Sequence, residues 1–122
     1  MKNNELTKIF ADSSYNYLET KDGKGEGRIC VLIPSEAEIR VEKIVISAEK
    51  ELRQLNNRFE LIAIERAVRI AKDLHIKNYE ILSDSRTAIG WSRLKNARWI
   101  PREKNEAGRH LERLKKSRRK IQ

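Results

Sequence analysis

The sequence contains little of what is typical of secreted or membrane proteins. Its 122 residues include a single cysteine, Cys30, so no disulfide can form within the chain. No apolar run approaches the roughly 20 residues that a membrane-spanning helix needs, and the opening stretch MKNNELTKIF has no apolar core of the signal-peptide kind. We therefore expect a cytoplasmic protein of one domain, residues 1–122, with no membrane or obligate protein partner and with Cys30 as a buried structural thiol.

Acidic residues are scarce in the last third of the chain. Residues 86–122 carry 13 Lys and Arg against 3 Asp and Glu, whereas residues 1–85 carry 14 against 15. A basic surface in a small protein most often binds nucleic acid, because cationic side chains displace the counterions condensed on phosphates. A solubilising tail is the alternative. Apolar residues such as Trp91, Trp99 and Leu111 interleave with the arginines, however, and this favours a folded basic face.

The order of the predicted elements indicates an α/β fold. Residues 6–13, 28–34 and 39–47 have strand patterns, and their succession predicts an antiparallel meander. A helical period follows over residues 57–74, with Asn57 as its N-cap; residues 48–55 form either a separate helical turn or an extension of this helix. Strand and helix then alternate over residues 78–85, 86–95, 97–101 and 106–122. This order predicts a mixed five-stranded sheet, its first three strands antiparallel, with helices packed on it.

Three acidic residues stand where a carboxylate needs a partner. Asp12 and Asp84 each follow an apolar segment at the end of a predicted strand. If the first and fourth strands are neighbours, these aspartates project together into the crevice where such sheets bind ligands. Glu60 lies on the sheet-facing edge of the predicted helix, although a capping box with Asn57 also explains it. Together the three predict a site for Mg²⁺, the hard cation that oxygen ligands favour, with Mn²⁺ as a substitute.

Four segments resemble motifs of the type 1 ribonuclease H family. ADSSYN at residues 11–16, NNRFELIAI at 56–64 and ILSDS at 81–85 are similar to the segments that carry that family's D…E…D constellation. WIPREKN at 99–105 is similar to its WVPREEN strand and turn, and the likeness spans nearly the whole chain in the family's order. The resemblance implies an RNase H-like fold and hydrolysis of the RNA strand of RNA–DNA hybrids with two divalent metal ions.

The same resemblance implies roles for individual residues. Asp12, Glu60 and Asp84 match the family's first three metal-binding carboxylates. Two asparagines match residues that contact the hybrid backbone. Two serines beside the aspartates are either hydrogen-bond donors to phosphate or to the carboxylates, or ordinary turn residues. Arginines of the basic third are expected phosphate contacts. The complete set of expected nucleic-acid contacts is Ser13, Asn56, Asn57, Ser85, Arg86, Arg93, Arg102, Arg109 and Arg113.

The chain departs from the family pattern near its end. Where the family has N..AD.LA, with the Asp as fourth carboxylate, this chain has NEAGRHLE, which places Arg109 at the Asp position. Arginine cannot bind a metal. Glu106 and Glu112 lie three residues to either side, on roughly the same helix face, and we expect Glu112 to replace the missing ligand. The alternative is that Glu112 only pairs with nearby cations, or that no residue replaces the ligand.

Two rival functions follow from this departure. In the first, the protein is a catalytically weak or inactive RNase H-fold module that binds hybrid or structured RNA through its basic C-terminal third. In the second, it is another nuclease of the same fold, such as a junction resolvase or an exonuclease. The pairing of NNRFEL with SDS favours ribonuclease H over the second rival.

Overall fold

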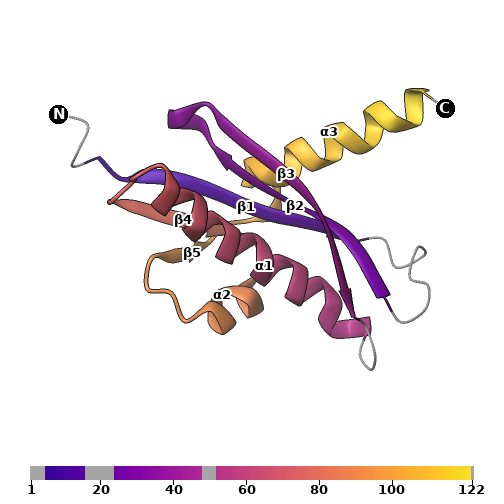
Figure 1. The fold of residues 1–122 in the computed structure, drawn as a ribbon, viewed down its shortest axis with the longest axis horizontal. Helices are drawn as coiled ribbons and strands as arrows, with labels where there is room; N and C mark the ends of the chain where they lie inside the picture. Colours follow the sequence, from indigo (N-terminus) through magenta and orange to yellow (C-terminus); the bar gives the residue numbers. More distant parts are fainter. Residues whose placement is uncertain (1–4, 16–23, 48–51, 122) are drawn as a thin grey trace.

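The computed structural model describes residues 5–15, 24–47 and 52–121. In chain order its strands and helices are β1 (Thr7–Tyr15), β2 (Lys24–Ile33), the 3₁₀ turn η3 (Pro34–Glu36), β3 (Glu38–Ser47), α1 (Leu52–Asp73), β4 (Tyr79–Ser83), α2 (Arg86–Ser92), β5 (Ala97–Trp99), the 3₁₀ turn η4 (Arg102–Lys104) and α3 (Glu106–Ile121) (Figure 1). Within these ranges, no helix combines the length and the apolar character that crossing a bilayer would require.

The strands form the predicted mixed five-stranded sheet, in the order β3-β2-β1-β4-β5. β1, β2 and β3 form the expected antiparallel meander, and β4 then pairs parallel to β1. β5 continues the sheet as a short parallel strand beside β4. The first and fourth strands are therefore neighbours at the centre of the sheet, which confirms the predicted fold class.

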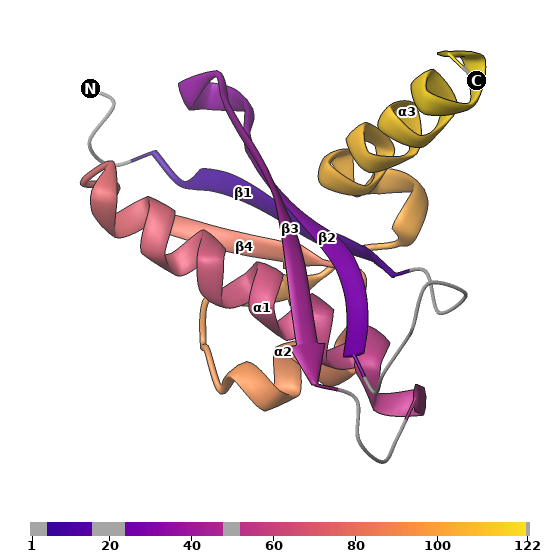
Figure 2. The same ribbon diagram turned by 45° about the vertical axis from the view of Figure 1, so that its right-hand side comes forward.

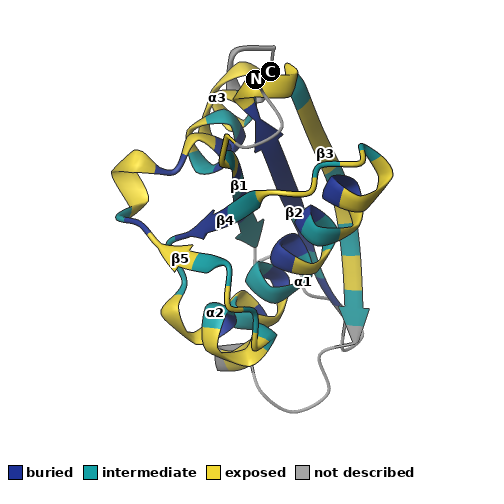
Figure 3. Cartoon of the chain, turned by 90° about the vertical axis from the view of Figure 1, so that its left-hand side faces the viewer, coloured by how far each residue is buried: buried dark blue, intermediate teal, exposed yellow. Residues whose placement is uncertain are grey.

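Helices cover the two faces of the sheet, as Figure 2 shows with α1 and α3 on opposite sides. Successive side chains of a strand point to opposite faces, and the core divides accordingly. Ile9 and Ala11 of β1 pack with the buried side of α1, with α2 beside it. On the other face, Cys30 of β2 packs with Ala107 and Leu111 of α3, so the predicted burial of this thiol is confirmed. Buried residues follow the central strands and the inner side of α1, whereas much of β3 is exposed (Figure 3).

The first helix starts earlier than the local sequence signals predict. α1 begins at Leu52 and continues without a break to Asp73, so Asn57 lies inside the helix and the predicted N-cap is wrong. The helix gains its extra turn from tertiary packing, because Leu55 and Phe59 are buried against Gly25 and Gly27 of β2. Residues 48–51, the start of the possible separate turn, lie outside the described residues.

The first two strands are also longer than their predicted ranges, residues 6–13 and 28–34. β1 runs on to Tyr15, because Ser13, Ser14 and Tyr15 pair with Ile29, Arg28 and Gly27 of β2. Gly27 permits this close pairing, since a Cβ there would lie 2.7 Å from the Ser14 carbonyl oxygen. Asp12 is therefore inside a strand, and the prediction that it ends one is wrong. Residues 16–23, between these two strands in the sequence, lie outside the described residues.

Candidate active site

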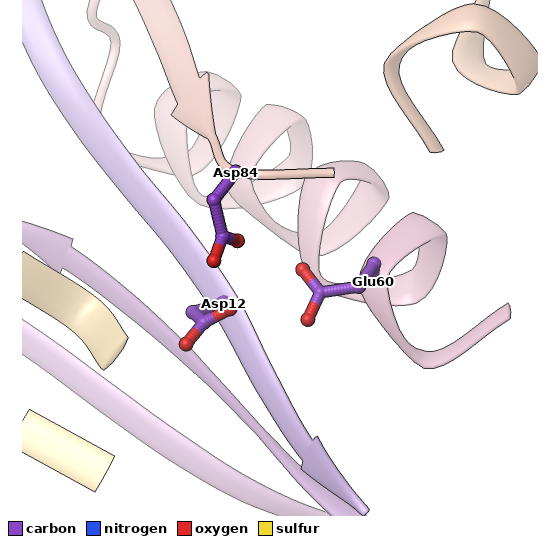
Figure 4. Close-up of side chains that lie close together, drawn as sticks. All are labelled: Asp12, Glu60 and Asp84. Carbon is purple, nitrogen blue, oxygen red and sulfur yellow. The ribbon is translucent and has the colours of Figure 1, made fainter. Parts of the chain in front are cut away.

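The structure brings Asp12, Glu60 and Asp84 together at one end of the parallel strand pair (Figure 4). The last aligned residues of β1 and β4 are Phe10 and Leu82, so the two aspartates each stand two residues beyond the same rung. Glu60 reaches the same point from α1. Each residue offers a carboxylate oxygen, and these oxygens all lie within 4.8 Å of one another.

The crevice exists because the two strands end differently. β4 stops at Ser83, whereas β1 continues for three residues beyond Asp12 alongside β2. Open space therefore borders β1 on the side that β4 leaves. This is the kind of crevice in which α/β sheets bind ligands. Asp12 stands at its base and is only 7% exposed.

Glu60 is held by β1 and not by a helix cap. Its Oε1 accepts hydrogen bonds from the backbone N–H of Ser13, at 3.2 Å, and from the Ser13 hydroxyl, at 2.5 Å. The alternative explanation of Glu60, a capping box with Asn57, is therefore wrong, because Asn57 lies inside α1. The other carboxylate oxygen, Oε2, is buried and has no hydrogen-bond partner among the described residues. A buried oxygen without a donor is costly, so the Glu60 carboxylate needs either a proton shared with Asp12 in a hydrogen bond between the two side chains or a cation.

Burial and the neighbouring negative charges raise the pKa of two carboxyls of this cluster. Burial raises the pKa of Asp12 to about 9, and the negative charges of Glu60 and Asp84 contribute to that rise. Burial also raises the pKa of Glu60 to about 7, although the hydrogen bonds from Ser13 lower it. In the part of the chain that the structure describes, no Lys or Arg forms an ion pair with any of the three carboxylates. Either protons or an added cation must therefore relieve their repulsion.

The three residues fit a divalent cation. All donors are carboxylate oxygens, the ligands that Mg²⁺ and Mn²⁺ favour, and Glu60 Oε2 has an unmet need for a positive partner. A bound cation would replace the shared protons and restore the ionised forms. Asp12, Glu60 and Asp84 would hold such an ion.

Two residues at the start of α3, its capping residue Asn105 and Gly108, complete the site, and neither was predicted as a site residue. Asn105 is fully buried, and its side-chain amide donates to the Ala11 carbonyl oxygen at 3.0 Å. Its Oδ1 accepts from the backbone N–H groups of Ala107 and Gly108, at 3.1 and 3.4 Å, which caps the start of α3. Gly108 then lies against Asp12, where a Cβ would collide with Asp12 Oδ2. The cap was recognisable from the sequence NEAG, but its bond to β1 was not.

The trio opens into a pocket of about 830 Å³ whose rim carries four cationic side chains and two further acidic ones, Glu103 and Glu112. Cationic side chains surround the acidic centre from three elements, α2, η4 and α3, and they are Arg86, Arg102, Arg109 and Lys115. The expected nucleic-acid contacts that line this pocket are Ser13, Asn56, Asn57, Ser85, Arg86, Arg102 and Arg109. Arg93 and Arg113 are not among its described lining residues. Arg93 ends α2 in a left-handed conformation, and the charge of Arg113 acts on Cys30.

The two candidates for a fourth carboxylate are placed differently. Glu112 lines the pocket from α3, and its Oε1 lies 4.0 Å from Lys115 Nζ. Glu106 lies six positions before Glu112 in the same helix and is not among the described lining residues. Neither belongs to the cluster whose oxygens lie within 4.8 Å of one another. The role of Glu112 as a ligand therefore stays a prediction.

Comparison with known proteins identifies a matching protein family and similar solved structures. A model of the RNase H family, described as "RNase H", matches residues 4–121. The fold resembles the N-terminal RNase H domain of Rv2228c from Mycobacterium tuberculosis, solved as a fusion with maltose-binding protein, with a TM-score of 0.54 and 16% identity over 88% of this chain and 95% of that one. It also resembles LC11-RNase H1 in complex with an RNA/DNA hybrid, with a TM-score of 0.54 and 18% identity over 86% and 92% of the two chains. The comparison with curated proteins found no match.

The range of the family match includes the whole carboxylate cluster. The match covers nearly the whole chain, and within it lie all three acidic residues that the sheet topology brings together. The chain belongs to the RNase H family.

Proposed function

We propose that the protein is a divalent-metal-dependent endoribonuclease that hydrolyses the RNA strand of RNA–DNA hybrids. The observation that carries the proposal is the convergence of Asp12, Glu60 and Asp84, with one buried Glu60 oxygen that has no described partner. Membership of the RNase H family supports nuclease activity on hybrids. The LC11-RNase H1 structure, which contains an RNA/DNA hybrid, supports the choice of ligand.

The residues of this chain divide the reaction between an acidic centre and a basic rim. Asp12, Glu60 and Asp84 bind the cations, and Glu112 supplies the fourth carboxylate from α3. Ser13 holds Glu60 in place through two hydrogen bonds. Bound divalent cations supply the activation of water and the stabilisation of the leaving oxygen that phosphodiester hydrolysis needs. The reaction adds water across the P–O3′ bond and leaves 5′-phosphate and 3′-hydroxyl ends.

The rim positions the substrate. Arg86, Arg102 and Arg109 lie around the carboxylates, where their guanidinium groups bind phosphates of the hybrid. Asn56 and Asn57 of α1 offer amide donors and acceptors to the backbone of the nucleic acid. The A-form shape and the 2′-hydroxyl groups of the RNA strand distinguish it from DNA.

Cleavage assays on purified protein test this function. We expect Mg²⁺ or Mn²⁺ to support cleavage of an RNA–DNA hybrid, and Asp12→Asn to abolish it. Cleavage that survives Asp12→Asn would exclude the proposed site. A panel of hybrid, duplex DNA, four-way junction and single strands tests substrate class, and preferential cleavage of the junction or of single strands would favour another nuclease of this fold.

One specific observation favours a second function. Arg109 lines the pocket, and the resemblance of NEAGRHLE to the family pattern implies that it stands where that pattern has its fourth carboxylate. A module that only binds hybrid or structured RNA would benefit from this added charge. Tight hybrid binding with no cleavage in either Mg²⁺ or Mn²⁺ would support that function.

A further inference from the structure

Trp99, at the end of β5, makes two contacts with the segment that follows β4. Its indole Nε1–H donates a hydrogen bond to the carbonyl oxygen of Asp84, at 3.2 Å. The guanidinium carbon of Arg86 lies 4.1 Å from the centre of its ring. These partners are 15 and 13 positions away in the sequence, and both line the pocket. Trp99 itself is not among the described lining residues, so it stands behind the residues that face the substrate.

Ordinary packing does not account for this arrangement. Trp99 is 39% exposed and does not belong to either described core cluster, so its ring contributes less to the core than a buried aromatic would. A neighbouring arginine shows the alternative arrangement, because Arg98 pairs with Glu80 at 3.0 Å. Arg86 forms no ion pair with any described carboxylate. Its guanidinium carbon lies over the indole ring, and no hydrogen bond from its N–H groups is found among the described residues, so these groups are available for a ligand.

A guanidinium held in this way suits a phosphodiester. Stacking on an aromatic ring uses the face of the planar group, whereas bidentate binding to phosphate oxygens uses its edge. The indole thereby fixes the orientation of the long Arg86 side chain before the ligand binds. Binding then costs less side-chain entropy than it would for a freely rotating arginine. The same ring ties the backbone of Asp84, a member of the carboxylate cluster, to the edge strand of the sheet.

We infer that Trp99 is a positioning residue for nucleic-acid binding, which orients the Arg86 guanidinium toward a backbone phosphate of the bound hybrid and holds the Asp84 segment beside it. The inference rests on the proposed function for the identity of the ligand. It assigns the recognition of one phosphate to a pair of residues, one at the pocket rim and one behind it.

Hybrid-binding measurements over a range of salt concentrations test this inference. All variants carry Asp12→Asn, so that a fluorescently labelled RNA–DNA hybrid stays intact, and Kd is measured by anisotropy. Arg86→Gln should flatten the slope of log Kd against log salt by about 0.9, the value for one lost phosphate contact. Trp99→Leu should weaken binding by roughly two- to fivefold, the range expected for an exposed cation–π pair, and should reduce the slope in the same direction.

Trp99→Phe separates the two contacts. It keeps an aromatic face for Arg86 and removes the N–H donor to Asp84. In the Asp12→Asn background, we expect the slope of log Kd against log salt to equal that of the protein with Trp99. In the protein that retains Asp12, we expect Trp99→Phe to raise the Mg²⁺ concentration needed for half-maximal cleavage. Trp91→Leu is the matched control, because Trp91 is equally exposed, at 42%, and is not among the described lining residues. This control should change neither quantity.

The decisive measurement is whether the effects of Arg86→Gln and Trp99→Leu on hybrid binding depend on each other. Arg86→Gln should have a smaller effect in Trp99→Leu than in the parent, since the two residues act as a unit. Additive effects, or a Trp99→Leu protein with an unchanged salt slope, would overturn the inference. If that happens while the unmodified protein cleaves hybrid, the proposed function still stands. If coupling is found without cleavage, the phosphate contact stands and the nuclease function does not. No binding of hybrid by the parent protein would overturn both.

Discussion

Gly108 of α3 lies directly against the carboxylate of Asp12, with no room for a methyl group between them. The contact joins the last helix to the strand at the centre of the sheet. Asn105 fixes the approach, because its side chain binds both the Ala11 carbonyl and the start of α3. The position of the Asp12 carboxylate therefore depends on a residue that has no side chain.

Adding a methyl group at this contact should impair the site. We expect Gly108→Ala to push the Asp12 carboxylate from its place and to raise the Mg²⁺ concentration for half-maximal cleavage by roughly 10- to 100-fold, the usual cost of disturbing groups that support metal ligands. Gly90→Ala is the control, since a Cβ at Gly90 of α2 meets nothing within 4 Å. It should leave activity unchanged and stabilise the helix slightly. Equal Mg²⁺ dependence in the two variants would contradict this role of Gly108.

Removing the charge of Asp12 should stabilise the protein when no cation is present. Folding raises the pKa of Asp12 from 3.8 to about 9 and the pKa of Glu60 from 4.5 to about 7. Between the lower and the upper value of each residue, the folded state therefore binds more protons than the unfolded chain. Their contribution to the free energy of unfolding is complete below that window and is lost as the pH rises through it. In EDTA at pH 9, Asp12→Asn should therefore raise Tm by about 3 °C or more, the shift typical of 1 kcal/mol.

The same thermal measurement tests for the cation. Mg²⁺ should raise the Tm of the unmodified protein at pH 9 and should have little effect on Asp12→Asn, because a ligand that binds only the folded state stabilises it. At pH 4 the two proteins should melt much closer together. An Asp12→Asn protein that melts below the unmodified one at pH 9 in EDTA would show that the carboxylates do not repel one another as described.

Ser13 should set the pH at which Glu60 becomes available. Its hydroxyl bond to Glu60 Oε1 lowers the pKa of that carboxyl. Ser13→Ala should raise the pKa and shift the rising limb of the pH–activity profile toward higher pH, because a cation binds the ionised carboxylate. Ser92→Ala, which removes a hydroxyl that bonds within the α2 region, is the control for loss of stability alone. A profile that falls in height without moving along the pH axis would argue against this role.

The fourth carboxylate can be identified by comparing two glutamates of α3. Glu112 lines the pocket, and Glu106 is not among its described lining residues. Glu112→Gln should lower cleavage by at least about tenfold if Glu112 supports the metal site, whereas Glu106→Gln should have little effect. Small and equal losses would indicate a site of three carboxylates.

The basic end of the chain should contribute charge and no chemistry. Deleting residues 115–122 removes five Lys and Arg side chains. We expect weaker hybrid binding and a flatter dependence of log Kd on log salt, with the cleavage rate at saturating substrate retained. A large fall in that rate would place a catalytic contribution in this segment.

Much of the fold was predictable because its signals are local and periodic. Alternation in the strands, a helical period in α1 and turn residues between elements gave the element order, and chain order with short connections gave the sheet. The errors arose where contacts with distant segments determine where a helix or strand begins or ends. Asn57 has the chemistry of an N-cap, yet burial of Leu55 and Phe59 against β2 extends α1 beyond it. β1 likewise continues past Asp12 because β2 pairs with it.

The site was predictable in its parts and not in its contacts. Asp12 and Asp84 follow apolar segments, and the order of the strands makes their meeting plausible. No sequence pattern shows that Ser13 holds Glu60, that Asn105 binds the Ala11 carbonyl, or that Trp99 lies against Arg86. Each of these contacts joins residues 13 to 94 positions apart, so only the folded chain defines them.

The central place of β1 separates rigid from adaptable parts of the molecule. This strand is hydrogen-bonded to β2 on one side and to β4 on the other, so its amides should be among the last to exchange with deuterium. Arg102 and Arg109, by contrast, are exposed side chains on a short turn and near the start of the terminal helix. The acidic residues are thus fixed before any substrate arrives, while these two arginines can adjust to nucleic acids of different sequence.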